Sequence, residues 1–215
     1  MSLKTVQNSY DQVAASYDKN YRKFKYRARA FVIERSLRAL CQGKQVLELG
    51  CGTGRLADSL KLSGSQKSLY TGIDVSKEML ERARLKGHQV TYGNAEHLPF
   101  EDQSFDVVAG AKGVFRYLGG RLALKEASRV LRPGGTLVIH QYAQKTANIR
   151  RQRAVVNKNH IQGHEDYDTV AKEFGLIRTK VEKWRSISMP PYVVPIPMKS
   201  KGEWWSQINL FFQKL

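Results

Sequence analysis

Residues 46–57 read VLELGCGTGRLA, an apolar run followed at once by three glycines and then by a stretch with helical character. Glycine allows a sharp turn and a close approach of the backbone to a ligand, so this order predicts a buried strand, a ligand-binding turn and a helix. The spacing is G-x-G-x-G. It differs from the dinucleotide fingerprint, because Arg55 stands where the third glycine would be, and it lacks the G-K-[ST] ending of a phosphate loop. A tight turn without a ligand is the alternative interpretation.

Strand-like and helix-like segments alternate on both sides of this stretch. Strands are expected in 45–50, 68–75, 88–93, 104–111 and 136–142, with helices in 54–62, 76–87 and 121–132. The alternation predicts an α/β fold with a doubly wound, seven-stranded, mostly parallel sheet. Two late strands, in 177–188 and 203–215, are expected to form an antiparallel pair. Four prolines in the connection at 190–197 predict a loop.

Length and composition are those of one globular domain of 215 residues, of which 41% are hydrophobic and 26% charged. We expect a helical lid in 1–41, a ligand-binding core in 42–141, and a basic connection with the C-terminal strands in 142–215. No apolar run approaches the roughly 20 residues of a membrane helix, and the N-terminus lacks the apolar stretch of a secretory signal. Two cysteines give neither a disulfide framework nor a metal cluster, which favours the cytoplasm.

Asp74 is a candidate ligand-binding residue at the tip of the second expected strand, twenty residues after Gly54. A carboxylate at that place can accept hydrogen bonds from the two hydroxyls of a ribose. The alternative is a turn residue ahead of the helix that begins near Ser76.

The segments VLELGCGTG, GIDVS, GNAEHLPF, FDVV and LRPGGTLVI follow one another in this order and at these spacings. Together they resemble the class I S-adenosylmethionine-dependent methyltransferases. The likeness is greatest to the ubiquinone/menaquinone-biosynthesis C-methyltransferase type, which also has a segment similar to YDQVAASYD at 10–18. The resemblance covers roughly residues 10–140. It implies a Rossmann-like methyltransferase fold and the cofactor S-adenosyl-L-methionine, with S-adenosyl-L-homocysteine as product.

The resemblance also implies roles for individual residues. The glycine loop would hold the methionine part of the cofactor, with an acidic side chain near its ammonium group and the carboxylate of the next strand on the ribose. The implied cofactor-binding residues are Tyr17, Glu48, Gly50, Cys51, Gly52, Gly54, Asp74, Val75, Met79, Asn94, Ala95, Glu96 and Ala111. Tyr17 would belong to the lid, although a core aromatic is an alternative for it.

Candidate residues on the acceptor side follow the fourth and fifth strands, since open α/β sheets bind ligands at the carboxyl ends of their strands. They are Lys112, Arg116, Tyr117, His140 and Tyr142, of which Arg116, His140 and Tyr142 are preferred. His140 is the best candidate for a base because its ordinary pKa lies near neutrality. A strand-end histidine packed against a neighbour is the alternative. No metal site is expected, since His160 and His164 lie in a polar segment typical of a solvated surface.

The formal net charge is +17, and most of the surplus lies in 1–40 and 141–215. Such a field attracts nucleic acid, an acidic lipid surface or an acidic substrate. The preferred hypothesis is methyl transfer to a small-molecule acceptor, either anionic or membrane-associated. The alternatives are an RNA methyltransferase, suggested by YRKFKYRAR at 21–29 and IRRQR at 149–153, and a cofactor-binding protein without turnover. The oligomeric state is not predicted.

Overall fold

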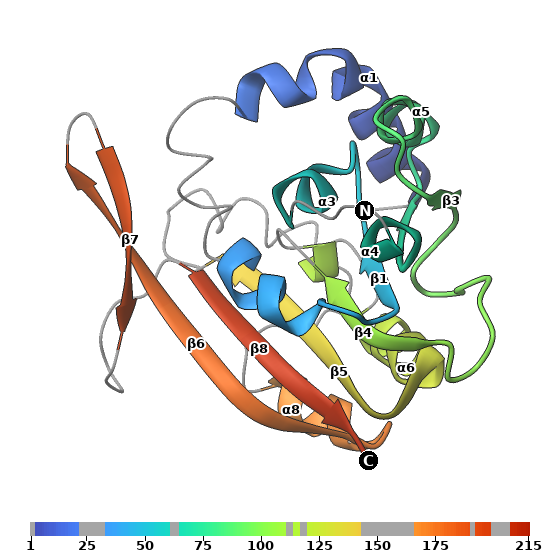
Figure 1. Cartoon of the computed structure of the whole chain (residues 1–215), viewed down its shortest axis with the longest axis vertical. Coiled ribbons are helices and arrows are strands. Elements are labelled where there is room, and N and C mark those ends of the chain that lie inside the picture. Colours follow the sequence, from blue (N-terminus) through green and yellow to red (C-terminus); the bar gives the residue numbers. More distant parts are fainter. Residues whose placement is uncertain are drawn as a thin grey trace.

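The computed structural model describes residues 3–21, 33–60, 65–110, 114–116, 120–142, 166–189, 192–198 and 207–215 (Figure 1). Its helices are α1 (Leu3–Tyr21), α3 (Arg55–Leu60), α4 (Ser65–Ser68), α5 (Lys77–Leu85), η1 (Val114–Arg116), α6 (Gly120–Val130) and α8 (Asp166–Lys172), together with a helical segment at 33–40. Its strands are β1 (Val46–Leu49), β2 (Tyr70–Asp74), β3 (Val90–Tyr92), β4 (Phe105–Gly110), β5 (Leu131–Tyr142), β6 (Leu176–Met189), β7 (Tyr192–Met198) and β8 (Gln207–Lys214).

The strands form one sheet in the order β3-β2-β1-β4-β5-β8-β6-β7. The first five are parallel to one another, and β8, β6 and β7 each run antiparallel to their neighbours. The predicted parallel core with an antiparallel C-terminal part is therefore confirmed. The change from parallel to antiparallel pairing occurs between β5 and β8.

The described sheet has one strand more than the seven expected, because residues 192–198 form β7 where four prolines suggested a loop. The antiparallel part thus has three strands rather than a pair. β7 lies at the edge of the sheet, and an edge strand tolerates proline at positions whose N–H would face away from the neighbouring strand.

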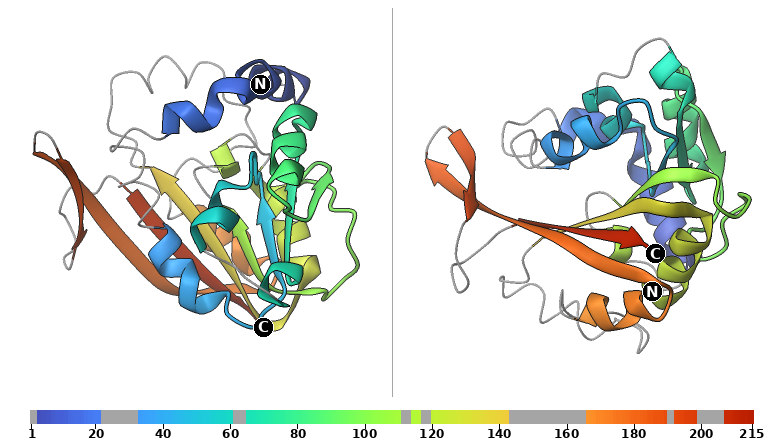
Figure 2. Two further views of the ribbon diagram at one scale, coloured as in Figure 1. Left: turned by 45° about the horizontal axis from the view of Figure 1, so that its top comes forward. Right: turned by 60° about the horizontal axis from the view of Figure 1, so that its bottom comes forward.

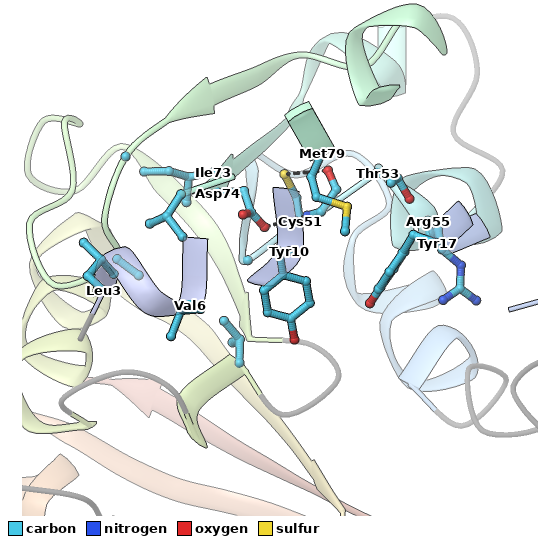
Figure 3. A pocket seen from close by; sticks show the side chains of 16 residues that line it. Leu3, Val6, Tyr10, Tyr17, Cys51, Thr53, Arg55, Ile73, Asp74 and Met79 are labelled. Atoms are coloured by element: carbon cyan, nitrogen blue, oxygen red, sulfur yellow. Dashed lines mark hydrogen bonds between the residues drawn. The ribbon is translucent and has the colours of Figure 1, made fainter. Parts of the chain in front are cut away.

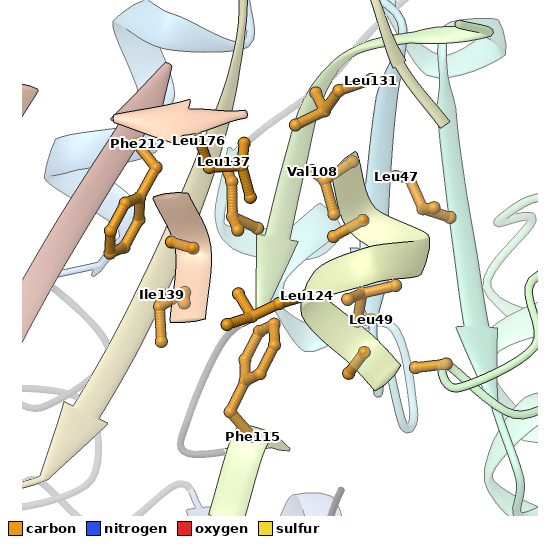
Figure 4. Packing of buried hydrophobic residues seen from close by; sticks show 14 of the residues in the cluster. Leu47, Leu49, Val108, Phe115, Leu124, Leu131, Leu137, Ile139, Leu176 and Phe212 are labelled. Carbon is orange, nitrogen blue, oxygen red and sulfur yellow. The ribbon is translucent and has the colours of Figure 1, made fainter. Parts of the chain in front are cut away.

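The core has two layers because successive side chains of a strand point to opposite faces of the sheet. On one face, Leu47, Val108 and Leu137 pack with α6 and α8 (Figure 4). On the other face, Val107 and Val138 pack with α3 and the helical segment 33–40. This doubly covered arrangement holds the ends of β1 and β2 in fixed positions, and these strands carry the glycine loop and Asp74.

Within the described part of the N-terminal region, residues 3–21 form α1 and residues 33–40 are helical, in agreement with the helical character that the sequence suggests for 5–41. α1 packs against α5, above the end of the sheet at which β1 and β2 stop (Figures 1 and 2). Most of the basic segment 21–29, all of 149–153, and both His160 and His164 lie outside the described residues. Among the helices that are described, none is long and apolar enough to cross a membrane.

Candidate functional site

The glycine loop turns the chain from β1 into α3 through backbone conformations that favour glycine. Gly50, Gly52 and Gly54 have φ values of 66°, 55° and 76°, all in the left-handed region. A Cβ at Gly50 would collide with the side chain of Val114, and one at Gly54 with His88. A Cβ at Gly52 would meet no atom within 4 Å. The first and third glycines are therefore required by packing as well as by φ, whereas the second faces open space.

Asp74 supports this loop from the end of β2. Its Oδ2 accepts a hydrogen bond from the Gly52 N–H at 2.8 Å, and its Oδ1 accepts one from the Ser76 N–H at 2.9 Å. Burial raises the pKa of Asp74 above its ordinary value, although the N–H donors of Ser76 and Gly52 act in the opposite direction. Ser76 in turn caps α5, because its Oγ accepts a hydrogen bond from the Met79 N–H at 3.2 Å. Both expectations for Asp74, a ligand-facing carboxylate and a turn residue, are thus compatible with its position.

A pocket opens between the loop, the end of β2, the start of α5 and the underside of α1 (Figure 3). The residues that line it are Leu3, Val6, Tyr10, Tyr17, Gly50, Cys51, Gly52, Thr53, Arg55, Ile73, Asp74, Val75, Met79, Gly93, Ala95 and Val114. One part is apolar and the other carries a cation and hydroxyl groups. The pocket therefore suits an elongated ligand with one apolar and one charged end.

Helix α1 covers this pocket with one of its faces. Leu3, Val6, Tyr10 and Tyr17 line it, and the rings of Tyr10 and Tyr17 meet edge to face with their centroids 6.2 Å apart. The spacing of these residues is that of a single helix face. The sequence pattern predicts the same face for Tyr10 and Tyr17, but it also places Val13 there, and that residue is 41% exposed.

Two aspartates of α1 attach it to the walls of the pocket. Asp11 accepts a hydrogen bond from the Ser76 hydroxyl at 2.5 Å. Asp18 accepts one from the Thr53 hydroxyl at 2.7 Å and pairs with Lys86 at 2.7 Å. Lys86 also donates to the Thr53 carbonyl oxygen at 2.8 Å. α1 is therefore tied both to the cap of α5 and to the glycine loop itself.

Replacing Asp18 by asparagine should loosen α1. Burial acts to raise the pKa of Asp18, but hydrogen bonds from Lys86 and Thr53 outweigh it and hold the pKa below the ordinary value of 3.8. The ionised form is thus the stabilising one above that pH, and its contribution is lost as the pH falls through the lowered pKa. Because the ion pair is partly exposed, we expect a loss of about 1 kcal/mol or less, seen as faster amide hydrogen exchange in α1.

Asp102→Asn is the matched control, because Asp102 also pairs with a basic side chain, Arg129, but lies away from α1. Exchange in α1 that is the same in both variants would show that Asp18 does not hold this helix.

Glu48 lies beneath the loop, and it is not among the described residues that line the pocket. Its side chain is 1% exposed and accepts a hydrogen bond from the Tyr70 hydroxyl. Burial, with the Glu48 charge beside it, raises the pKa of Tyr70 well above its ordinary value, so the phenol remains a donor. The position of Glu48 near a cofactor ammonium group stays a prediction.

Tyr70→Phe separates a supporting role of Glu48 from a binding role. A hydrogen bond to a charged group is worth about 1.5–3 kcal/mol, so we expect the free energy of unfolding to fall by about 2 kcal/mol in chemical denaturation. Ligand affinity should change little, because neither residue lines the pocket. Unchanged stability with a large loss of affinity would instead show that the Tyr70–Glu48 pair acts mainly on the ligand.

The other predicted residues are distributed as follows. Cys51, Val75, Met79 and Ala95 line the pocket together with Tyr17, Gly50, Gly52 and Asp74, whereas Gly54, Asn94 and Glu96 are not among the described lining residues. The Asn94 Oδ1 accepts a hydrogen bond from the Glu96 N–H at 3.0 Å, which shapes the loop next to Ala95. Ala111 lies outside the described residues.

The structure describes the side chain of only one of the acceptor-side candidates, His140. His140 is fully buried at the end of β5, in register with Asn209 of β8, as expected for a packed strand-end histidine. The side chains of Arg116 and Tyr142 lie outside the described part of the chain. No group of histidine, cysteine and acidic residues able to hold a metal occurs among the residues that the structure describes.

Several lining residues escape prediction from the sequence, although signals for some are present. Thr53 and Arg55 stand inside the stretch that predicts the loop, and Tyr10 belongs to the N-terminal segment that predicts a lid. Leu3 and Val6 continue the helix face of Tyr10 toward the N-terminus. Gly93 is the last residue of the expected strand 88–93 and Val114 begins η1, and the sequence analysis singles out neither as a pocket residue.

The comparisons with known proteins agree with this geometry. Residues 47–139 match the family model described as a methyltransferase domain. A demethylmenaquinone methyltransferase from Staphylococcus aureus is 38% identical over 119 residues, which are 52% of this chain and 48% of that protein. The chain thus spans about half the length of the curated relatives it matches.

Two solved structures share the fold. An S-adenosylmethionine-dependent methyltransferase from Thermotoga maritima aligns with a TM-score of 0.74 at 21% identity, over 97% of this chain and 99% of that one. The magnesium protoporphyrin IX methyltransferase of Synechocystis, solved with bound S-adenosylhomocysteine, aligns with a TM-score of 0.65 at 13% identity over the full length of both chains. Residues 47–139 therefore match a methyltransferase domain, and the chain has the fold of these solved methyltransferases.

Proposed function

We propose that this chain binds S-adenosyl-L-methionine in the pocket beneath α1 and transfers a methyl group to a small-molecule acceptor, with S-adenosyl-L-homocysteine as product. The observation that carries the proposal is the pairing of an open glycine, Gly52, with the carboxylate of Asp74 at the tip of the adjacent strand. The match of residues 47–139 to a methyltransferase domain supports it.

The polar groups of the pocket suit this cofactor. The Asp74 carboxylate accepts backbone hydrogen bonds from Gly52 and Ser76, and its two oxygens have further lone pairs for the two hydroxyls of a ribose. The open space at Gly52 is a cradle that any side chain would fill. Arg55 places a positive charge in the same pocket, suited to the carboxylate of a methionine group.

The apolar part of the pocket suits a flat nucleobase. Ile73, Val75 and Met79 line it from β2 and α5, Ala95 lines it from the connection after β3, and Val6 lies on the α1 side. Ligand pockets are commonly lined by apolar side chains with a few polar groups that fix orientation. The adenine would therefore lie between the sheet edge and α1, with the ribose on Asp74.

The chain contributes alignment and exclusion of water more than acid or base chemistry. The bound cofactor would supply a methyl group already activated by a sulfonium leaving group. Holding two reactants in line can be worth roughly 7–11 kcal/mol, provided that the geometry is tight. Tyr10 and Tyr17 would close the pocket from above, and the Asp11 and Asp18 contacts of α1 would keep them there.

The acceptor class rests on the relatives and on charge. A relative 38% identical to half of this chain is named as a demethylmenaquinone methyltransferase, which supports a small-molecule acceptor with quinone-like chemistry. The net charge of +17 supports an acceptor that is anionic or held at a membrane, reached from the cytoplasm. The basic segments that suggested RNA fall mostly outside the described residues, so that alternative keeps only its sequence argument.

The direct test is formation of S-adenosylhomocysteine by the full chain, measured by chromatography, with a demethylated naphthoquinol and with total RNA as separate acceptors. We expect product with the quinol and only background with RNA. Methyl transfer to RNA would overturn the acceptor class. Cofactor binding without product from any acceptor would favour a binding protein without turnover.

A further inference from the structure

The connection between β3 and β4 forms one wall of the pocket. Gly93 and Ala95, near its start, line the pocket. The Gly93 N–H donates to the carbonyl oxygen of Asp74 at 3.0 Å, which ties the start of the connection to the end of β2. Beyond the lining residues, the connection runs past α6 before it enters β4 (Figure 1). What holds the connection beside α6 therefore bears on the shape of the pocket.

Residues 93–97 form a tight turn in this wall. The N–H groups of His97 and Glu96 donate to the carbonyl oxygen and to the Oδ1 of Asn94, each at 3.0 Å. Asn94 thus shapes the turn from within, and neither Asn94 nor Glu96 is among the described lining residues. Ala95 does line the pocket, but its side chain has no polar atom. Polar contact from this turn to a bound base would therefore come from main-chain atoms, whose position decides how well the base is recognised.

Helix α6 holds the residue that follows the turn, Leu98. The Leu98 N–H donates to Glu126 Oε2 at 2.8 Å, and Arg129 Nη2 donates to the Leu98 carbonyl oxygen at 3.0 Å. The Leu98 side chain is buried in the same core cluster as the inner face of α6. Both main-chain polar groups and the side chain of Leu98 are thereby fixed against one helix.

Arg129 uses every donor of its guanidinium at this place. Nε and Nη2 donate to the two oxygens of Glu126 at 2.9 and 2.8 Å. Nη1 donates to the Phe100 carbonyl oxygen at 2.8 Å and to Asp102 at 2.7 Å. With the bond to Leu98, the five N–H groups make five hydrogen bonds. A lysine ammonium is a compact charge with fewer donors, so it cannot replace this planar contact.

Helix α6 is a firm support for these contacts, because one of its faces is part of the core. Ala123, Leu124 and Ala127 are fully buried beneath the sheet (Figure 4). The hydrogen bond from Arg129 lowers the pKa of Glu126 more than burial raises it, so the pair is ionised at neutral pH. The Glu126–Arg129 pair therefore links a buried helix to the wall of the pocket.

We propose that Glu126 and Arg129 are positioning residues that make the pocket selective for adenine, because they fix the main chain of the 93–97 turn against the edge of the base. This inference rests on the proposed binding of S-adenosylmethionine. Neither residue is among those that line the pocket in the described part of the chain, so each acts through the turn. A purely structural role would lower the affinity for every ligand alike, whereas positioning alters the preference between bases.

The test compares two ligands of the full chain in calorimetry, S-adenosylhomocysteine and S-inosylhomocysteine. In the second, an oxo group replaces the amino group of the base, which exchanges the donor and the acceptor on that edge. We expect the wild type to prefer the adenine ligand by at least about tenfold, because mismatched buried polar groups are costly. In Arg129→Lys and in Glu126→Gln the ratio of affinities should fall to about threefold or less, since the turn is then no longer held in register.

Arg132→Lys is the matched control. Arg132 also pairs with an aspartate, Asp106, at 2.8 Å, but it does so near the start of β5, whereas the 93–97 turn follows the carboxyl end of the parallel strand β3. Asp102→Asn is a second control, because it removes one partner of Arg129 and leaves both hydrogen bonds to Leu98 in place. Both controls should keep the wild-type ratio, and thermal melting should show that all four variants are folded at the temperature of the measurement.

A wild-type ratio in both Arg129→Lys and Glu126→Gln, or an equal fall in Arg132→Lys, would overturn the inference and leave the proposed function standing. Equal affinity of the wild type for the two ligands would do the same. A wild type that does not bind S-adenosylhomocysteine would overturn the proposed function and this inference together.

Discussion

Asp74→Ala is expected to weaken binding of S-adenosylhomocysteine by at least about 100-fold in calorimetry. The carboxylate would accept hydrogen bonds from two ribose hydroxyls, and a bond to a charged group is worth about 1.5–3 kcal/mol, so about 3 kcal/mol or more is lost. The variant also removes the acceptor for the Gly52 N–H, which loosens the loop. Both effects act in the same direction on affinity.

Asp106→Ala is the matched control for this prediction. The Asp106 carboxylate accepts a hydrogen bond from the Gln45 N–H at 2.8 Å, much as Asp74 accepts one from Gly52, but it lies near the start of β4 and does not line the pocket. Its loss should lower stability and leave affinity unchanged. Equal affinity in wild type and Asp74→Ala would refute the ribose role.

Acid should weaken the cofactor complex through the same residue. Because burial raises the pKa of Asp74, the carboxylate takes up a proton at a higher pH than an ordinary aspartate does. Protonation removes the charged acceptor, so affinity should decline as the pH falls through this raised pKa. The residual affinity of Asp74→Ala should lack that dependence, which a calorimetric series over pH can show.

Gly52→Val is expected to abolish detectable cofactor binding. Gly52 has φ of 55°, where a β-branched residue is strained by about 1–3 kcal/mol, and the new side chain would fill the space beside Asp74. Steric blockage of the cradle should cost at least about 100-fold in affinity. Binding is measured by calorimetry and stability by thermal melting.

Gly43→Val separates strain from blockage. Gly43 has φ of 70° and, like Gly52, has no atom within 4 Å of the place that a Cβ would take, but it does not line the pocket. The two variants should lose similar stability, and only Gly52→Val should lose binding. Retained affinity in Gly52→Val would contradict the assignment of the loop.

Much of the fold is predictable because its determinants are local. The strand, glycines and helix at 46–57 and the alternation that follows specify a parallel core, since each element carries its own periodicity. β7 escapes prediction because proline content argues against a strand, while the deciding fact is that β7 lies at the sheet edge. Edge position is a property of the whole sheet and leaves no local signal.

The candidate site divides in the same way. Gly52 and Asp74 are predictable because a turn needs glycine and a strand tip needs a polar residue, and both line the pocket. The Asp18–Thr53–Lys86 cluster joins residues that are far apart in sequence, so no local motif predicts their contact. Glu48 fits the family pattern. The alternation of side chains along its strand, however, places it beneath the loop and next to Tyr70, whose hydroxyl donates a hydrogen bond to it.

A crystal structure of the full chain with S-adenosylhomocysteine tests the central claim most directly. We predict the ligand beneath α1, with both ribose hydroxyls within hydrogen-bond distance of the Asp74 carboxylate and the amino-acid end against Gly50–Gly54. A ligand bound elsewhere, or a ribose that makes no contact with Asp74, would contradict it.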